Sequence, residues 1–295
     1  MKKIDSLLWE ARHHANDKWL LSVELLEQII EIDPKVYPAH ELLYIIYMQR
    51  SLFQKTEKII QRAMKYFPDD DYLKFLMGNV FLAQKGKSRE AITWYKRIET
   101  EIVEMDFNLA VAYTYQDEIK KAVKILKKVF TRFNHLPKTY IFFAEQYLRL
   151  KEYDNAIDLL TAGKKKFPSK RQICYLLGVS YNRKRDWIHA FVNFNEAHQL
   201  GYNNAEFYNT WANCCFEMGN SGLAVKYFTK SIQKNIFFLK SYLDLSRLYV
   251  AEKKFAQARR YLELAKRIDP LDIYVTLATQ QLKRIFKTLE DYEKN

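Results

Sequence analysis

The side chains best suited to chemistry fall into short groups along the chain. Asp69, Asp70 and Asp71 place three carboxylates in a row, and His13 with His14 offers two imidazoles. The aspartates lack the spacing of a calcium-binding loop, so we expect them to cap the start of a helix. Neighbouring side chains on a helix point about 100° apart, so we do not expect the two histidines to share a metal ion.

The cysteines and the remaining motifs do not indicate catalysis. Cys174, Cys214 and Cys215 have neither the spacing of a metal site nor that of a disulfide framework, so they are expected to be buried thiols. The sequence contains no HExxH pair, no glycine-rich phosphate loop and no nucleophile elbow. It therefore predicts a protein that is not an enzyme, with no catalytic residue, no metal and no cofactor.

The composition favours an all-helical, basic protein. Of 295 residues, 48% are hydrophobic and 15% aromatic, which is too apolar for a disordered chain. Only 7 glycines and 6 prolines are present, too few for the tight turns of a sheet protein. Lysine and arginine number 48 against 35 acidic residues, which gives a net charge of +13. No signal peptide and no apolar run of about 20 residues is visible, so a cytoplasmic location is expected.

A period of 34 residues runs through nearly the whole chain. Each period contains a large residue followed by a small one, then an aromatic residue, an alanine and a second bulky residue. One period has these types at Leu177, Gly178, Tyr181, Ala190 and Phe194. The next has Trp211, Ala212, Ala224 and Phe228, with Cys215 in place of the aromatic residue. The periods begin near residues 3, 37, 71, 103, 137, 171, 205 and 239, and the interval from 71 to 103 is 32 residues. Such a period is typical of stacked helix pairs.

These columns resemble the tetratricopeptide repeat (TPR) family. The resemblance implies an all-α fold, an α-α solenoid (superhelix) of eight 34-residue TPR-like helix pairs that forms one domain over residues 1–295. One more helix, at 272–290, is expected to cap the C-terminal end, with Lys283, Arg284 and Lys287 facing water. The residues expected to cover the last pair are Ile273, Leu277, Leu282, Ile285, Phe286 and Leu289.

The resemblance also implies a concave groove, lined by the first helices at repeat positions 2, 5, 9, 12 and 13. The expected partner-binding residues are Phe75, Asn79, Phe107, Asn108, Tyr115, Lys138, Ile141, Glu145, Arg149, Tyr175, Arg183 and Asn213. Asn79, Asn108 and Lys138 match positions with which some family members clamp a terminal carboxylate. Because Phe75 and Phe142 replace two of the cations, that clamp is not expected here, although the two amides suit a peptide backbone.

The resulting hypothesis is a non-enzymatic scaffold or adaptor that binds a peptide or helix of a partner protein, within a multiprotein assembly. The net charge keeps an alternative open, a basic solenoid that binds nucleic acid or another anionic surface. Lys120, Lys124 and Lys128 lie on the expected convex wall without aromatic residues on which bases stack, so nucleic-acid binding is not expected. Peripheral contact with an anionic surface stays open, as does self-association through the N-terminus, where no capping segment precedes the first helix.

Overall fold

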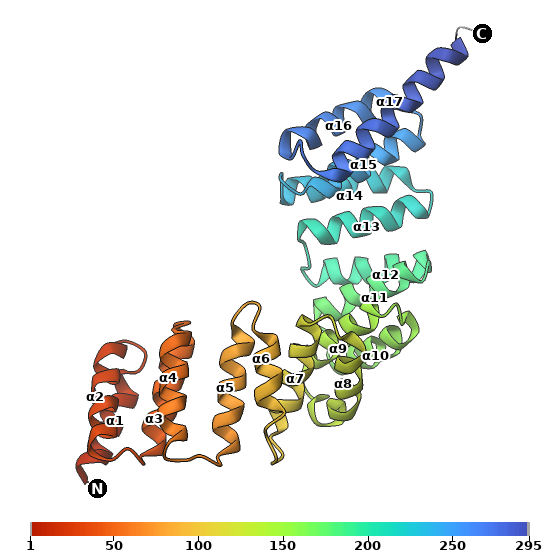
Figure 1. Ribbon diagram of the computed structural model, residues 1–295. Coiled ribbons are helices and arrows are strands. Elements are labelled where there is room, and N and C mark those ends of the chain that lie inside the picture. Colours follow the sequence, from red (N-terminus) through yellow and green to blue (C-terminus); the bar gives the residue numbers. More distant parts are fainter. Residues whose placement is uncertain (1, 294–295) are drawn as a thin grey trace. The chain divides into compact units, whose positions relative to one another are not determined.

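A computed structural model describes residues 2–293 of the chain, and its side chains at residues 3–102 and 104–285. Over residues 2–293 the chain forms seventeen α-helices and no strand, which confirms the all-α prediction (Figure 1). The helices are α1 (Lys2–His14), α2 (Trp19–Ile32), α3 (Tyr37–Gln49), α4 (Phe53–Met64), α5 (Asp71–Ala83), α6 (Ser88–Tyr95), α7 (Val103–Tyr115), α8 (Ile119–Phe133), α9 (Pro137–Arg149), α10 (Tyr153–Lys166), α11 (Arg171–Arg183), α12 (Trp187–Gln199), α13 (Ala205–Glu217), α14 (Ser221–Lys234), α15 (Leu239–Ala251), α16 (Phe255–Ile268) and α17 (Ile273–Glu293).

The helices stack as antiparallel pairs in two units, residues 1–133 and 134–295. The odd-numbered helix of each pair begins at residue 2, 37, 71, 103, 137, 171, 205 or 239. Within each unit this is the architecture of an α-α solenoid, because each pair buries its apolar faces against its neighbours. That one array continues from the first unit into the second stays a prediction.

Most of the first helices, α9 and α11 among them, end in the same kind of turn. The second residue after the helix adopts a positive φ, for example 60° at Lys151 and 66° at Arg185. The amide that follows then reaches back five residues, so that Glu152 N donates to Tyr147 O and Asp186 N to Tyr181 O, each at 2.9 Å. This left-handed cap satisfies carbonyl groups that the helix end leaves open.

Small residues let the two helices of a pair approach closely. Ala144 and Ala212 on the first helices are fully buried, as are Ala190 and Ala224 on the second helices. At Gly178 an added Cβ atom would lie 2.5 Å from Cδ1 of Phe194, and at Gly78 in the first unit it would lie 2.3 Å from Cε1 of Tyr95. The small-residue columns thus set the spacing of the helices in both units.

The shortened period from 71 to 103 is accommodated in its second helix and the turn that follows. Helix α6 has only 8 residues, and residues 96–102 lead from it into α7. Asp71, which is 8% exposed, holds this turn. Its Oδ2 accepts from Glu99 N at 3.0 Å and Thr100 N at 2.7 Å, while Lys74 Nζ donates to its Oδ1 at 2.7 Å. Asp70 caps α5 by accepting from the amides of residues 72 and 73, so the expected capping role is confirmed.

An Asp71→Asn variant is expected to lower the free energy of unfolding by about 2 kcal/mol at neutral pH, because buried donors lose a charged acceptor. Hydrogen bonds from Lys74 and from the backbone at Thr100 and Glu99 hold the pKa of Asp71 well below its usual range. Since the folded-state pKa is depressed, this stabilisation is complete above about pH 4 and is lost as the pH falls further. Melting temperatures of wild type and variant should therefore differ by a constant amount from pH 6 to 8 and converge below about pH 4. Asp69→Asn, at an exposed position, is the control, and an equal loss in both variants would contradict this role.

The C-terminal helix α17 packs on the last pair through a face that matches the predicted one only in part, since Leu282 was predicted and Val275 was not. Val275 and Leu282 are buried against α15 and α16, at 1% and 6% exposure, whereas Ile273 and Leu277 are 66% and 49% exposed. The prediction for Ile273 and Leu277 is therefore wrong, because the buried stripe follows residues 275, 278 and 282. Ile285 is half-buried and Lys283 is exposed, as is Arg284. The side chains of Phe286, Lys287 and Leu289 lie outside the described residues, and the capping role stays a prediction.

All three cysteines are buried, as predicted. Cys174, Cys214 and Cys215 are at most 1% exposed, and each is a free thiol. Burial raises the pKa of the Cys174 thiol to about 11 and those of Cys214 and Cys215 to about 12. The three thiols are therefore protonated at neutral pH and pack as small apolar groups.

Candidate functional site

In the first unit the two predicted amides lie together. Asn79 Oδ1 on α5 accepts from Asn108 Nδ2 on α7 at 2.8 Å and from the Tyr95 hydroxyl on α6 at 2.7 Å. Tyr44 on α3 is also hydrogen-bonded to Asn79, and burial raises the pKa values of both tyrosines. The short period before α7 thus leaves Asn108 in line with Asn79. Their hydrogen bonds, however, join neighbouring helices within the unit.

The predicted aromatic residues of the first unit differ in accessibility. Phe75 is only 7% exposed and packs against Tyr95, with ring centroids 6.2 Å apart. Phe107 is half-buried, and its ring lies 5.7 Å from that of Phe133. Tyr115 is 66% exposed, beside a hollow of about 430 Å³ at the turn between α5 and α6. Of the three, Tyr115 offers a partner the most surface.

In the second unit some of the predicted residues on α9 are buried. Ile141 is 8% exposed and belongs to a core cluster with Leu177. Glu145 is half-buried, and burial raises the pKa of its carboxyl group. Lys138 and Arg149, near the two ends of α9, are exposed. These residues therefore supply accessible charge at the helix ends and little accessible apolar surface between them.

Three predicted residues, Tyr175, Arg183 and Asn213, do come together. They line a polar hollow of about 280 Å³ on α11, α13 and α15. Tyr175 is half-buried and stacks on Tyr202 with centroids 4.7 Å apart, and desolvation raises its pKa. Arg183 is exposed at the end of α11. The hollow therefore has an aromatic wall and a cationic rim.

A hydrogen-bond network forms the floor of this hollow. Asp244 Oδ2 on α15 accepts from Asn213 Nδ2 at 2.8 Å and from Asn209 Nδ2 at 3.0 Å. Arg247 Nη2 donates to Asn213 Oδ1 at 2.7 Å and lies 3.6 Å from Asp244 Oδ1. The charge of Asp244 is thus already compensated within the unit, whereas Arg183 and Lys240 stand exposed at the rim.

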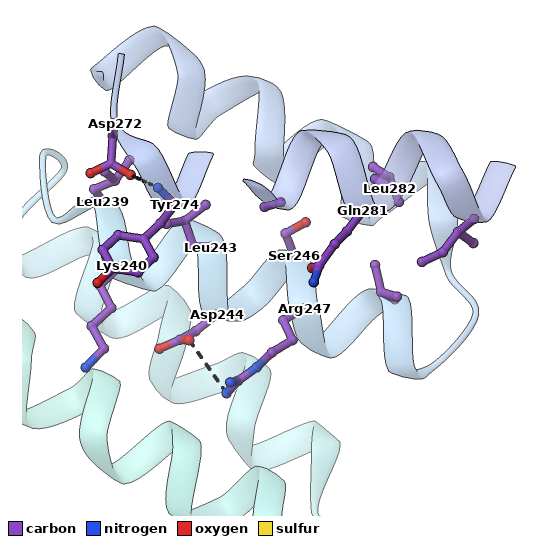
Figure 2. A pocket seen from close by; sticks show the side chains of 13 residues that line it. Leu239, Lys240, Leu243, Asp244, Ser246, Arg247, Asp272, Tyr274, Gln281 and Leu282 are labelled. Carbon is purple, nitrogen blue, oxygen red and sulfur yellow. Dashed lines mark hydrogen bonds and ion pairs between the residues drawn. The ribbon is translucent and has the colours of Figure 1, made fainter. Parts of the chain in front are cut away.

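A second and larger hollow of about 600 Å³ lies between α15 and α17 (Figure 2). Its lining is mainly apolar, and Figure 2 shows Leu243 and Leu282 on its two sides, with Lys240, Asp244 and Arg247 along one edge. The latter three residues also line the polar hollow. We call the two hollows together the C-terminal recess, and it runs over α11, α13, α15 and α17.

The apolar half of the C-terminal recess was absent from the predicted site. Its residues on α15 occupy the register positions that the resemblance assigned to the groove. These residues are Lys240, Leu243, Arg247 and Val250, at positions 2, 5, 9 and 12 of the period that begins at 239. The same register, carried one period further, places Tyr274 and Gln281 of α17 at positions 2 and 9. The register of the period would therefore have identified these residues from the sequence.

Other kinds of site are not found in the part of the chain that the structure describes. Among those residues, no three histidine, cysteine, aspartate or glutamate side chains are grouped closely enough to hold a metal ion. Within the same residues, no helix has the length and apolar character needed to cross a bilayer.

Comparison with known proteins finds similarity to tetratricopeptide repeats. Residues 239–270 match the family model of the tetratricopeptide repeat. The TPR repeat-containing protein YpiA of Bacillus subtilis is 23% identical over 242 residues, which are 80% of this chain and 56% of YpiA. Other curated relatives match 44% of this chain and only 20–21% of their own length. The chain thus spans between about a fifth and just over half the length of the curated relatives it matches.

Solved structures show the same fold. A tetratricopeptide repeat protein from Parabacteroides merdae superimposes with a TM-score of 0.64 at 15% identity, covering 88% of this chain and 98% of that one. The hetero-tetramer Cut9–Hcn1 of APC/C gives a TM-score of 0.61 at 17% identity, covering 94% of this chain and 55% of the matched chain.

Proposed function

We propose that this chain, a tetratricopeptide-repeat protein, is a non-enzymatic scaffold that binds a segment of a partner protein in its C-terminal recess. The observation that carries the proposal is the continuity of an apolar hollow with a cationic, hydrogen-bonding one on consecutive first helices. Recesses that combine apolar walls with a few convergent polar groups are where proteins bind ligands. A similar structure, Cut9–Hcn1, is itself a complex of two different proteins, and this supports a protein as the partner.

The lining of the C-terminal recess defines the segment that it fits. Leu243, Val250 and Leu282 offer an apolar surface on which one face of a helix or an apolar side chain packs. Arg183 and Lys240 stand at the rim, while Asp244 is occupied by its amide and guanidinium partners. The expected segment therefore has apolar residues next to at least one acidic residue.

The residues that the sequence predicted in the middle of the chain have different roles in this proposal. Tyr175, Arg183 and Asn213 belong to the C-terminal recess itself. Tyr115 offers exposed aromatic surface in the first unit, where Asn79 and Asn108 hold neighbouring helices together. We propose that Tyr115 and its hollow form a separate, secondary contact within the first unit.

A charge-reversal experiment tests the proposal even while the partner protein is unidentified. A displayed library of random peptides is selected separately on wild type and on the Arg183→Glu/Lys240→Glu double variant. Wild type should enrich peptides in which acidic residues flank apolar ones, and the variant should enrich basic residues at the same places, because like charges across an interface are rejected. Arg185→Glu/Lys253→Glu, at exposed positions in the turns between paired helices, is the matched control and should select as wild type does. Identical peptides from wild type and from the recess variant would contradict the proposed site.

A further inference from the structure

Two turns of the second unit expose large apolar side chains at their tips. Phe237, between α14 and α15, is 71% exposed and its neighbour Ile236 is 59% exposed. Leu271, between α16 and α17, is 90% exposed. Phe237 and Leu271 are 34 residues apart and so occupy the same register position in consecutive periods. Neither residue lines the C-terminal recess.

The two tips lie on the same edge of the second unit. Residues that follow them, Leu239 and Lys240 at the start of α15 and Tyr274 at the start of α17, line one hollow and lie close together in Figure 2. In Figure 1 the turns that join α12 to α13, α14 to α15 and α16 to α17 follow one another along one edge of the stack. We call this edge the turn edge.

The turn edge also carries a concentration of positive charge. The turn between α10 and α11, with the helix ends beside it, has Lys165, Lys166, Lys170 and Arg171 and no acidic residue. Arg171 Nη1 donates to Gly201 O at 3.2 Å, which joins this turn to the next one on the edge. Lys234 and Lys240 are exposed on either side of the Phe237 tip.

The acidic residues near the Leu271 tip accept hydrogen bonds from backbone amides. Asp269 Oδ1 accepts from Leu271 N at 3.0 Å. Asp272 Oδ1 accepts from Tyr274 N at 2.8 Å and from Val275 N at 3.0 Å. These carboxylates shape the turn and the start of α17, and the lysine-rich turns give the edge as a whole its positive sign.

We propose that the turn edge attaches the protein peripherally to an anionic lipid surface, with Phe237 and Leu271 inserted at the level of the headgroups. The shape of the edge favours a lipid surface over a protein partner, because the apolar side chains project from turn tips and do not line a hollow. A lipid interface accepts single projecting apolar side chains, and lysines beside them pair with anionic headgroups. Each lysine near such a surface adds roughly 1 kcal/mol of attraction, or about fivefold in affinity.

The experiment is co-sedimentation of the full chain with lipid vesicles. One set of vesicles is phosphatidylcholine alone, and in the other roughly a third of the lipid is phosphatidylglycerol. Wild type should bind the anionic vesicles at least tenfold more tightly, and the difference should shrink between about 50 and 200 mM salt. Equal binding to both vesicles, or binding to neither, would overturn the proposal.

Two variants separate insertion from charge. Phe237→Ser/Leu271→Ser should weaken binding to anionic vesicles at least tenfold, because two side chains no longer enter the interface. Its matched control is Ile188→Ser/Val192→Ser, which removes two apolar side chains that are 70% and 55% exposed on α12. Unchanged binding by the Phe237→Ser/Leu271→Ser variant, or an equal loss in the control, would overturn insertion at the turn edge.

The charge variant is Lys165→Gln/Lys166→Gln/Lys170→Gln, which should lower affinity for anionic vesicles at least tenfold and flatten its dependence on salt. Lys151→Gln/Arg185→Gln/Lys253→Gln removes the same charge from the turns between paired helices, at the opposite edge. All substituted positions are exposed, so helix content measured by circular dichroism should stay unchanged. If the two charge variants bind equally, general basicity and not the turn edge attracts the lipid, and the proposal fails.

Discussion

A Leu243→Glu variant should bind peptides selected on wild type at least a hundredfold more weakly. Leu243 lies in the wall of the C-terminal recess, between the charged edge and helix α17. Losing an apolar anchor costs about 2 kcal/mol, and desolvating the new carboxylate under the bound segment adds a cost of similar size. Together these amount to more than two orders of magnitude in the dissociation constant. Fluorescence anisotropy of a labelled peptide measures the change directly.

A control variant and a stability measurement distinguish loss of the binding surface from a general effect of the new charge or from unfolding. Ile188→Glu places the same charge at a 70% exposed position on α12 and should leave affinity within about twofold. The melting temperature of Leu243→Glu has to be measured as well, because Leu243 also packs partly against the cluster that contains Val275 and Leu282. A folded Leu243→Glu variant with wild-type affinity would show that the segment does not pack between α15 and α17.

A Gly178→Leu variant should lower the stability of the second unit by about 3 kcal/mol. The side chain would have to occupy space held by Phe194, which is fully buried and lies 2.5 Å from the position of the first added carbon. Overpacking a rigid core forces helices apart or side chains out of their rotamers. Because α11 carries Tyr175 and Arg183, the displacement should also weaken peptide binding. Thermal and denaturant unfolding measure the first effect.

A compensating substitution tests the cause of this loss. Phe194→Ala removes the ring that the new side chain would meet, so Gly178→Leu/Phe194→Ala should be more stable than the sum of the two single changes predicts. Gly222→Ala, at an exposed helical position whose nearest atom is 3.8 Å away, should change stability by less than about 0.5 kcal/mol. Strict additivity of the Gly178 and Phe194 substitutions would contradict close approach of α11 and α12.

The fold could be predicted from the sequence because each physical requirement of the helix pair recurs every 34 residues. Gly178 and Ala212 fill equivalent places, and so do Ala190 and Ala224, so repetition compensates for the weakness of any one signal. The left-handed caps were not visible in the sequence, because lysine, arginine, serine and aspartate occupy most of these positions. Residue type predicts such a cap only where glycine or asparagine is present. The clamp that Asp71 makes on the shortened turn is likewise a tertiary contact that no local pattern encodes.

The register of the repeat predicts only part of the candidate site, because accessibility also depends on how closely the neighbouring helices pack. Register position identifies which side chains point to one face, and Tyr175, Arg183 and Asn213 line one hollow. It does not say how much of each side chain the neighbouring helices cover. Phe75 and Ile141 have the right register and are nearly buried, whereas α15 and α17 leave a hollow between them. For α17 the prediction was likewise right in part, because Leu282 is buried whereas Ile273 and Leu277 are exposed.

Hydrogen exchange measured with and without a selected peptide tests the central claim most directly. Peptic fragments assigned to individual helices of the second unit locate the contact without any substitution. Binding in the C-terminal recess predicts slower exchange in α15 and α17, a smaller change in α11 and α13, and none in α12, α14 and α16. Slower exchange confined to α12, α14 and α16 would contradict the account, because it would place the partner on the opposite face of the stack.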